Sequence, residues 1–292
     1  MIYAALSAIS PCAIIRIAFL DQRPLIGVSM HRLLQLLTVC LFITLFLTTS
    51  ATAEDLSAAQ IIDKMESGFQ NENMLMQFKM TIHSKSGQAR ERKLRARMKK
   101  ENNLSRSVIS FEEPADVRAV KFLVIENKDR DDDQMLYLSS IKRVRRIASS
   151  QRSGSFMGTD FSYNDLTSHD PDEGKHKRLA DETLDGKDCY VVESIPNDPE
   201  DYGYGKAVWW VQKGNLVAQK ADLYDKSLKL QKEMSASNLD EYKPGKWLAK
   251  KIIMKNVQKG TWTQIDILKH KSDADIGDDY FTERFLKDES KL

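Results

Sequence analysis

The sequence has few of the residues on which covalent or metal-dependent chemistry relies. Of three cysteines, only Cys189 follows residue 53, which excludes an intrachain disulfide within residues 54–292. The histidines of that segment are His83, His169, His176 and His270. They show no metal-ligand spacing, and the sequence contains no G-x-S-x-G nucleophile elbow. We therefore expect no enzyme activity, no cofactor and no metal site.

Long apolar runs are also scarce, and the clearest lies near the amino terminus. Met30-His31-Arg32 precedes the apolar run Leu33–Leu47, and Ala51-Thr52-Ala53 follows it. A short basic start, an apolar stretch and an A-x-A site in this order predict a cleavable signal peptide over residues 30–53. The run has about 15 residues, whereas a membrane-spanning helix needs roughly 20, so an uncleaved anchor is the less favoured alternative. Residues 1–29 are then best explained as a mis-annotated extension ahead of the true start.

Neither sign of charge is in excess. The full chain carries a formal net charge of +2, and residues 1–53 contain three arginines but one aspartate. The remaining segment, 54–292, is therefore close to neutral, and no nucleic-acid partner is expected. A segment of this size can bury a sizeable core. We expect it to form one domain and to be a monomer.

Alternation of apolar and polar residues is the main structural signal in residues 54–292. It runs from Met74 to Ile82 and resumes around Leu94 after a turn at Ser86–Gln88, which predicts a β-hairpin. Further strands are predicted at 104–111, 119–126, 134–138, 187–194, 207–212, 216–224, 228–236, 248–257 and 261–268. The short turns between several of these favour an antiparallel meander. With a helix at 56–69 and a short helix or turn at 278–286, we predict a mainly β chain of the α+β class with one strongly curved antiparallel sheet.

The concave side of such a sheet is predicted to be lined by the alternating apolar residues. The candidates are Met76, Phe78, Met80, Leu94, Met98, Phe122, Val124, Trp210, Leu228, Leu230, Ile252 and Met254. Methionine is frequent, and its flexible thioether chain suits a surface that adapts to apolar ligands. The alternative is a filled core beneath the helices, which for any single residue of the set is the more common case.

Two further features stay open between a functional and a structural interpretation. Arg143, Arg145 and Arg146 belong to a basic run in which, on a strand, Arg143 and Arg145 share one face. They could hold anionic groups of a ligand or an acidic face of a partner, or pair with nearby aspartates. Residues 148–174 are rich in Ser, Gly and Asp and are predicted to be irregular. They form either a functional loop or a solvated cover for one end of the sheet.

The central sequence resembles a known family. Leu136–Ile147, which reads LYLSSIKRVRRI, and Ser153–Leu166, which reads SGSFMGTDFSYNDL, are similar to the signature of the outer-membrane lipoprotein-sorting proteins. These are periplasmic proteins similar to LolA and LolB, and the similarity extends from the first helix to Leu286. The loop residues of the motif are Phe156, Met157, Gly158, Asp160 and Phe161.

The resemblance implies an incomplete β-barrel with helices covering its open side and a hydrophobic cavity that shields acyl chains in the periplasm. It implies a carrier that binds a lipid or lipoprotein acyl group and transfers it between membranes or membrane machines. Some relatives are thought to work beside RND-type (MMPL-like) exporters, so the arginine cluster would face an exporter, an outer-membrane acceptor or a headgroup. The alternative is a ligand-free accessory subunit of such an exporter.

Overall fold

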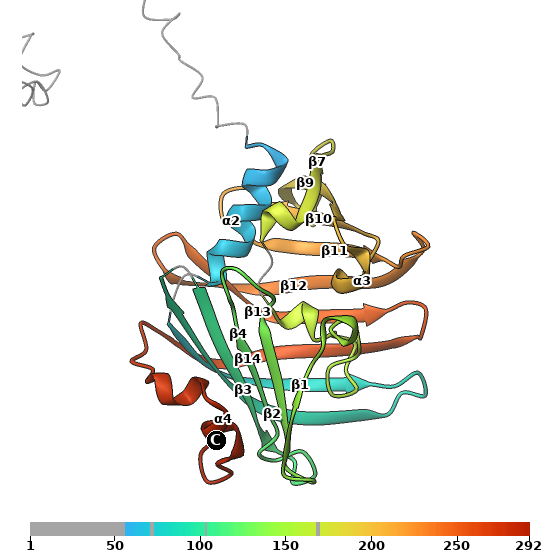
Figure 1. The fold of residues 1–292 in the computed structure, drawn as a ribbon. Coiled ribbons are helices and arrows are strands. Elements are labelled where there is room, and N and C mark those ends of the chain that lie inside the picture. Colours follow the sequence, from blue (N-terminus) through green and yellow to red (C-terminus); the bar gives the residue numbers. More distant parts are fainter. Residues whose placement is uncertain (1–55, 71–72, 103, 168–169) are drawn as a thin grey trace, which may run out of the picture. The chain divides into compact units, whose positions relative to one another are not determined.

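The computed structural model describes most of the chain that follows residue 55. The described part consists of residues 56–70, 73–102, 104–167 and 170–292 (Figure 1). The predicted extension, residues 1–29, and the predicted signal peptide, residues 30–53, lie outside the described residues. Residues Leu56–Leu292 form one compact unit.

One sheet of fourteen antiparallel strands makes up most of the described chain. The strands are β1 (Met74–His83), β2 (Ala89–Glu101), β3 (Leu104–Glu113), β4 (Lys121–Ile125), β5 (Asp133–Leu138), β6 (Arg143–Arg146), β7 (Gly174–Arg178), β8 (Glu182–Leu184), β9 (Lys187–Pro196), β10 (Lys206–Gln212), β11 (Ala218–Tyr224), β12 (Leu230–Lys243), β13 (Lys246–Asn256) and β14 (Thr261–Ser272). Their order is β6-β5-β4-β3-β2-β1-β14-β13-β12-β11-β10-β9-β7, and β8 pairs with β9 outside this path. Because β6 and β7 end the path without pairing to each other, the sheet is curled but not closed (Figure 1). This confirms the predicted fold class.

The helices are short and lie against the sheet. They are α2 (Ala58–Gln70), α3 (Pro199–Tyr202), α4 (Glu283–Lys287) and the 3-10 turns η2 (Ser149–Gln151), η3 (Asn164–Leu166), η4 (Pro171–Glu173) and η5 (Asp278–Phe281). Ser57 begins α2 with a capping box, because its hydroxyl accepts from the Gln60 amide while the Gln60 side chain accepts from the Ser57 amide. Ile61 and Ile62 are buried against β9 and β10, so α2 packs by one apolar stripe.

The structure adds three strands that were not predicted, β6, β7 and β8, and moves the start of β12. β7 reads Gly-Lys-His-Lys-Arg and β8 has three residues, so neither carries an apolar alternation; both form by backbone pairing to β9. β12 begins at Leu230 rather than at Leu228. The preceding residues form a turn in which the Asp225 carboxylate accepts from the Ser227 and Lys229 amides.

The two faces of the sheet have different covers. Met80, Phe122 and Leu248 share one buried cluster, although they belong to β1, β4 and β13, which are distant in the sheet order. Only the inside of a curled sheet brings such strands together, and we call this the inner face. The outer face at β3–β5 packs Val108 and Leu123 against apolar residues of the carboxy-terminal segment, among them Phe285. This segment covers the outside of the sheet: α4 lies beside β4, β5 and β6, and η5 lies beside β3. Figure 1 shows both at one end of the sheet.

Candidate functional site

The inner face carries a large buried apolar cluster, here called the inner cluster. Its buried members are Met74, Met76, Phe78, Met80, Leu94, Ala96, Phe111, Val117, Val120, Phe122, Val124, Leu136, Ile147, Phe156, Leu248 and Ile267. Six of the twelve residues predicted to line the concave side belong to it, and Met98 packs against it. The β1–β2 register explains the set, because Phe78 opposes Leu94 and Met74 opposes Met98 on the same face.

Ile252 and Met254 lie in a neighbouring inner-face cluster with Phe161 and Tyr204. Leu230 is half-buried at the start of β12, and Leu228 lies outside the sheet in the preceding turn with 60% of its surface exposed. The structure therefore does not bring Leu228 together with the other candidates.

Trp210 lies on the outer face, and its neighbour Trp209 takes the inward position. Trp209 pairs with Val192 and packs beside α2. Trp210 instead donates from its indole nitrogen to Glu182 at 2.8 Å, and the Lys220 ammonium lies 4.0 Å from the centre of its ring. Because the two tryptophans are adjacent, the sequence alone does not reveal which of them faces the inside of the sheet.

The segment between β6 and β7 inserts into the inner cluster. Phe156 is fully buried, with its ring centre 5.8 Å from that of Phe111, 5.3 Å from that of Phe122 and 5.5 Å from that of Tyr163. The chain reverses directly after it, where Gly158 has φ +77°, a conformation that glycine adopts without strain. We call residues 153–163 the plug loop, because the side chain of Phe156 fills space between the strands on the inner face.

Polar contacts hold the plug loop in place. The Asp160 carboxylate, 8% exposed, accepts from the hydroxyls of Thr261 and, at 2.8 Å, of Thr263. The Asp160 amide donates to the Thr263 hydroxyl at 3.0 Å. Arg92 donates to the Met157 carbonyl at 2.7 Å. All five family-motif residues of this loop, including Phe161, thus lie in one packed turn anchored to β2 and β14.

Replacing Asp160 by alanine should release this anchor. Two hydroxyl donors would lose a charged acceptor, so we expect the free energy of unfolding to fall by about 2–4 kcal/mol. Hydrogen exchange should show lost protection in residues 153–163 before the β1–β2 strands are affected. Asp129→Ala, which removes an exposed carboxylate in the β4–β5 hairpin, is the matched control. Equal stability of the two variants would contradict the anchoring role.

A buried polar network lies behind the plug loop. The Tyr204 hydroxyl donates to Asp165 at 3.0 Å and accepts from Lys232 at 2.7 Å, and the Asp165 carboxylate also accepts from the Ser162 amide at 2.7 Å. Burial, and next the Asp165 charge, raise the pKa of Tyr204 well above its ordinary value. A polar cavity of about 70 Å³ borders this network, with room for ordered water. Sequence reasoning missed these residues, since Asp165, Tyr204 and Lys232 are far apart along the chain.

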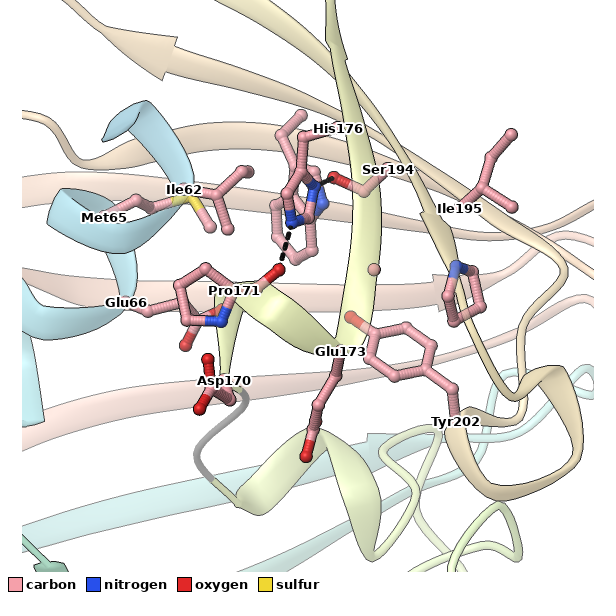
Figure 2. Close-up of a pocket in the computed structure, with 13 residues that line it drawn as sticks. Ile62, Met65, Glu66, Asp170, Pro171, Glu173, His176, Ser194, Ile195 and Tyr202 are labelled. Carbon is pink, nitrogen blue, oxygen red and sulfur yellow. Dashed lines mark hydrogen bonds between the residues drawn. The ribbon is translucent and has the colours of Figure 1, made fainter. Parts of the chain in front are cut away.

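A small apolar pocket lies at the seam between α2, η4 and β9 (Figure 2). Its volume is about 30 Å³, which suits a water molecule but not an acyl chain. Ile62 and Met65 of α2 face it (Figure 2). On the opposite side, His176 lies 2.8 Å from both the Ser194 hydroxyl and the Pro171 carbonyl. The carbonyl can only accept, so Nε2 of His176 carries the proton. In this structure the seam is therefore closed.

The predicted basic cluster divides into paired and unpaired members. Arg146 pairs with Asp133 at 2.8 Å, and Arg145 donates to the amide oxygen of Gln151 at 2.6 Å. Hydrogen bonds from Arg130, and then from Arg146, hold the pKa of Asp133 at about 2. Arg143 lies opposite Leu138 on the same face as Arg145, and it is exposed and forms no ion pair with another described residue. The aspartate pairing that was one alternative thus holds for Arg146 and not for Arg143.

The described residues contain neither a membrane-spanning helix nor a cluster of metal-binding side chains. No helix there is both long and apolar enough to span a membrane. No group of three or more His, Cys, Asp or Glu side chains is placed to hold a metal ion within the same ranges.

Comparisons with known proteins agree on the fold. A family model described as an uncharacterized protein matches residues 103–288. A structure from Vibrio parahaemolyticus, described as an outer membrane lipoprotein-sorting protein domain, is 28% identical with a TM-score of 0.74, covering 79% of this chain and 98% of its own. A DUF1329 family protein from Desulfovibrio piger is 29% identical with a TM-score of 0.74, covering 78% and 97%.

A LolA superfamily protein from Nitrosomonas europaea is 21% identical with a TM-score of 0.64, covering 79% of this chain and 99% of its own, and this likeness concerns the fold. The search of curated protein sequences gave no significant match.

Proposed function

The chain belongs to the outer-membrane lipoprotein-sorting protein family of LolA-like fold, and on that premise we propose that it is a periplasmic carrier of acyl chains. It would bind the acyl group of a lipid or lipoprotein on its inner face and transfer it between membranes or membrane transport machines. The name of the structural neighbour from Vibrio parahaemolyticus supports a role in lipoprotein sorting.

The inner cluster is the observation that carries this proposal. It combines flexible methionines such as Met76 and Met80 with aromatic residues on one face of the sheet. Each methylene of an acyl chain gains about 0.8 kcal/mol on leaving water, so a carrier must offer an apolar surface that competes with a membrane on nearly equal terms. A continuous apolar face beneath a loop, rather than beneath a second sheet, can provide that surface.

Loading requires the plug loop to leave the inner cluster. Phe156 fills the centre of that cluster, and the α2 seam holds only about 30 Å³. The loop is fastened to the sheet by side-chain hydrogen bonds, which can open without unpairing the sheet. Its isolated β-bridge, between Ser155 and Ser162, is internal to the loop. An acyl chain would then take the place of the Phe156 ring, exchanging one apolar contact for another.

The carrier function is tested by looking for cargo. Protein purified from its native periplasm should yield co-purifying lipid by mass spectrometry after solvent extraction, and lipid-free protein should take up a fluorescent fatty-acid probe. Phe122→Asp would place a carboxylate in the inner cluster and should abolish uptake. Leu268→Asp, at a 52% exposed position in the β14 bulge, should not. Repeated absence of both lipid and uptake would refute carriage.

The filled inner face favours a second candidate, a ligand-free accessory subunit of an RND-type exporter. If Phe156 never leaves the cluster, the domain is a solid scaffold whose function lies on its surface. This alternative predicts that the protein co-purifies with a membrane transporter and that its unfolding temperature is unchanged by fatty acids. A carrier would be stabilised by bound acyl chains through mass action.

The periplasmic location rests on the family and on the predicted leader. Cleavage after Ala53 would release the domain as a soluble carrier, whereas retention of residues 30–53 would tether it to the membrane. We expect amino-terminal sequencing of the protein purified from the periplasm to begin at Glu54. A chain that starts at residue 1 or 30 and fractionates with membranes would contradict the shuttle form of the proposal.

A further inference from the structure

The turn between β5 and β6 presents an isoleucine to solvent. Ile141 is 58% exposed, although it follows the buried strand β5. Its amide donates to the Leu138 carbonyl at 3.3 Å, and the next residue, Lys142, has φ +51°, so the turn is tight. Turns of this kind usually carry Gly, Asn or Asp for conformational reasons. An exposed aliphatic residue at this position has no evident role in folding.

Exposed cations lie next to this isoleucine in the chain and in the adjoining loop. Lys142 and Arg143 are exposed, as is Arg118 in the β3–β4 loop, and none of the three forms an ion pair with another described residue. The two loops are joined, because the Ser139 hydroxyl donates to the Arg118 carbonyl at 2.7 Å. We call Arg118, Ile141, Lys142 and Arg143 the basic tip. It lies at the lower end of the sheet in Figure 1.

Nearby charges do not neutralise the basic tip. The aspartates of the β4–β5 hairpin pair with arginines elsewhere, as in the contact of Asp133 with Arg130 and Arg146. Glu112 and Glu113 pair with β2 residues, at 2.7 Å to Arg95 and at 3.0 Å to Lys93. Asp116 is the one exposed carboxylate in the adjoining loop, so the tip keeps an excess of positive charge.

We propose that the basic tip docks the protein on an anionic lipid surface. A bilayer offers anionic headgroups above an apolar layer, and the tip matches that order with cations beside a projecting aliphatic side chain. An acidic protein surface would complement the cations but gives no reason for Ile141 to project. This proposal rests on the proposed function and deepens it, because it names the surface at which a carrier would collect or deliver its cargo.

Vesicle binding tests the proposal with the full-length mature protein and without cargo. We expect co-sedimentation with phosphatidylcholine vesicles containing phosphatidylglycerol, little binding to pure phosphatidylcholine, and release at high salt. Lys142→Gln with Arg143→Gln should weaken binding about 30-fold, since each cation near an anionic surface contributes about fivefold. Ile141→Ser should weaken it about fivefold to tenfold.

Matched variants give the controls. Lys229→Gln with Lys250→Gln removes the same charge from exposed positions elsewhere, and Leu228→Ser removes an equally exposed aliphatic residue from another turn. Both should bind vesicles like the parent protein. Equal weakening by the control pair, equal binding to neutral vesicles, or binding to polyglutamate without binding to vesicles would overturn the proposal.

Fatty-acid probe uptake in vesicle-free solution separates this proposal from the proposed function. The Lys142→Gln, Arg143→Gln protein should take up the probe normally, because both residues lie outside the inner cluster. Loss of vesicle binding with retained uptake identifies a docking defect alone. Vesicle binding in a protein that never takes up the probe would refute carriage and leave the docking surface standing.

Discussion

Phe156→Ala is expected to lower the free energy of unfolding by about 3–5 kcal/mol. The ring is fully buried and contacts three other aromatic rings, so its removal forfeits burial and leaves a void that the sheet cannot close. In a domain of this size, that loss corresponds to a fall in the unfolding temperature of about 6–20 °C. Urea denaturation followed by tryptophan fluorescence measures it.

The same substitution should increase uptake of an apolar probe if the inner face is the cargo site. The void lies among Phe111, Phe122 and Tyr163, and cavities of this apolar kind stay dry and bind small hydrophobic molecules. Phe281→Ala is the matched control, because Phe281 is 5% exposed but packs on the outer face with the carboxy-terminal segment. Both variants lose stability, yet only Phe156→Ala should gain uptake. Equal uptake in the two would contradict an inner-face site.

The sheet could be predicted from sequence because its signal is local. Alternation from Met74 to Ile82 and short turns specify antiparallel hairpins, and the register puts Met76, Phe78 and Leu94 on one face. However, alternation along a strand shows only which residues share a face, and it does not show which face lies inside the curled sheet. In β10 the two adjacent tryptophans point to opposite faces, so either face could be the inner one. The pairing of Trp209 with Val192 places Trp209 on the inner face.

The plug loop could be recognised as a motif but not as a plug. Gly154, Gly158 and the surrounding hydroxyl residues favour an irregular segment, and the structure confirms that it contains turns rather than strands. Its inward course depends on contacts across more than one hundred residues, such as that of Asp160 with Thr263. The network of Asp165, Tyr204 and Lys232 is non-local in the same way. Contacts between residues so far apart in the chain produce no repeating pattern that a single sequence could reveal.

Lys121 should make stability depend on pH in the alkaline range. Its side chain is fully buried on the outer face, and its ammonium donates to the carbonyls of Phe285 at 2.9 Å and of Asp288 at 2.6 Å. Burial lowers the pKa of Lys121 to about 8, although the Asp288 charge opposes this shift. In the unfolded chain a lysine titrates near 10.4. The protonated form is therefore the one that folding disfavours.

Between pH 8 and 10 the unfolded chain accordingly binds more protons than the folded one, so the free energy of unfolding should rise with pH by about 2 kcal/mol. The neutral amine keeps two N–H donors, so both contacts to the segment that includes α4 survive deprotonation. This rise in stability should end near pH 10. The hydrogen bond to the Glu289 carboxylate raises the pKa of Tyr137 to about 12, so the stability that this hydrogen bond contributes is lost as the pH rises above 10.

Lys121→Met should remove this rise, while Lys250→Met, at an exposed position on β13, should retain it. Urea denaturation at half-unit intervals between pH 7.5 and 10 gives the three slopes. The parent and Lys250→Met proteins should gain stability across the window, and the Lys121→Met protein should stay level. Parallel slopes for all three would show that Lys121 titrates alike in the folded and unfolded chains. In that case the hydrogen bonds to the Phe285 and Asp288 carbonyls would fully offset the effect of burial on the pKa of Lys121.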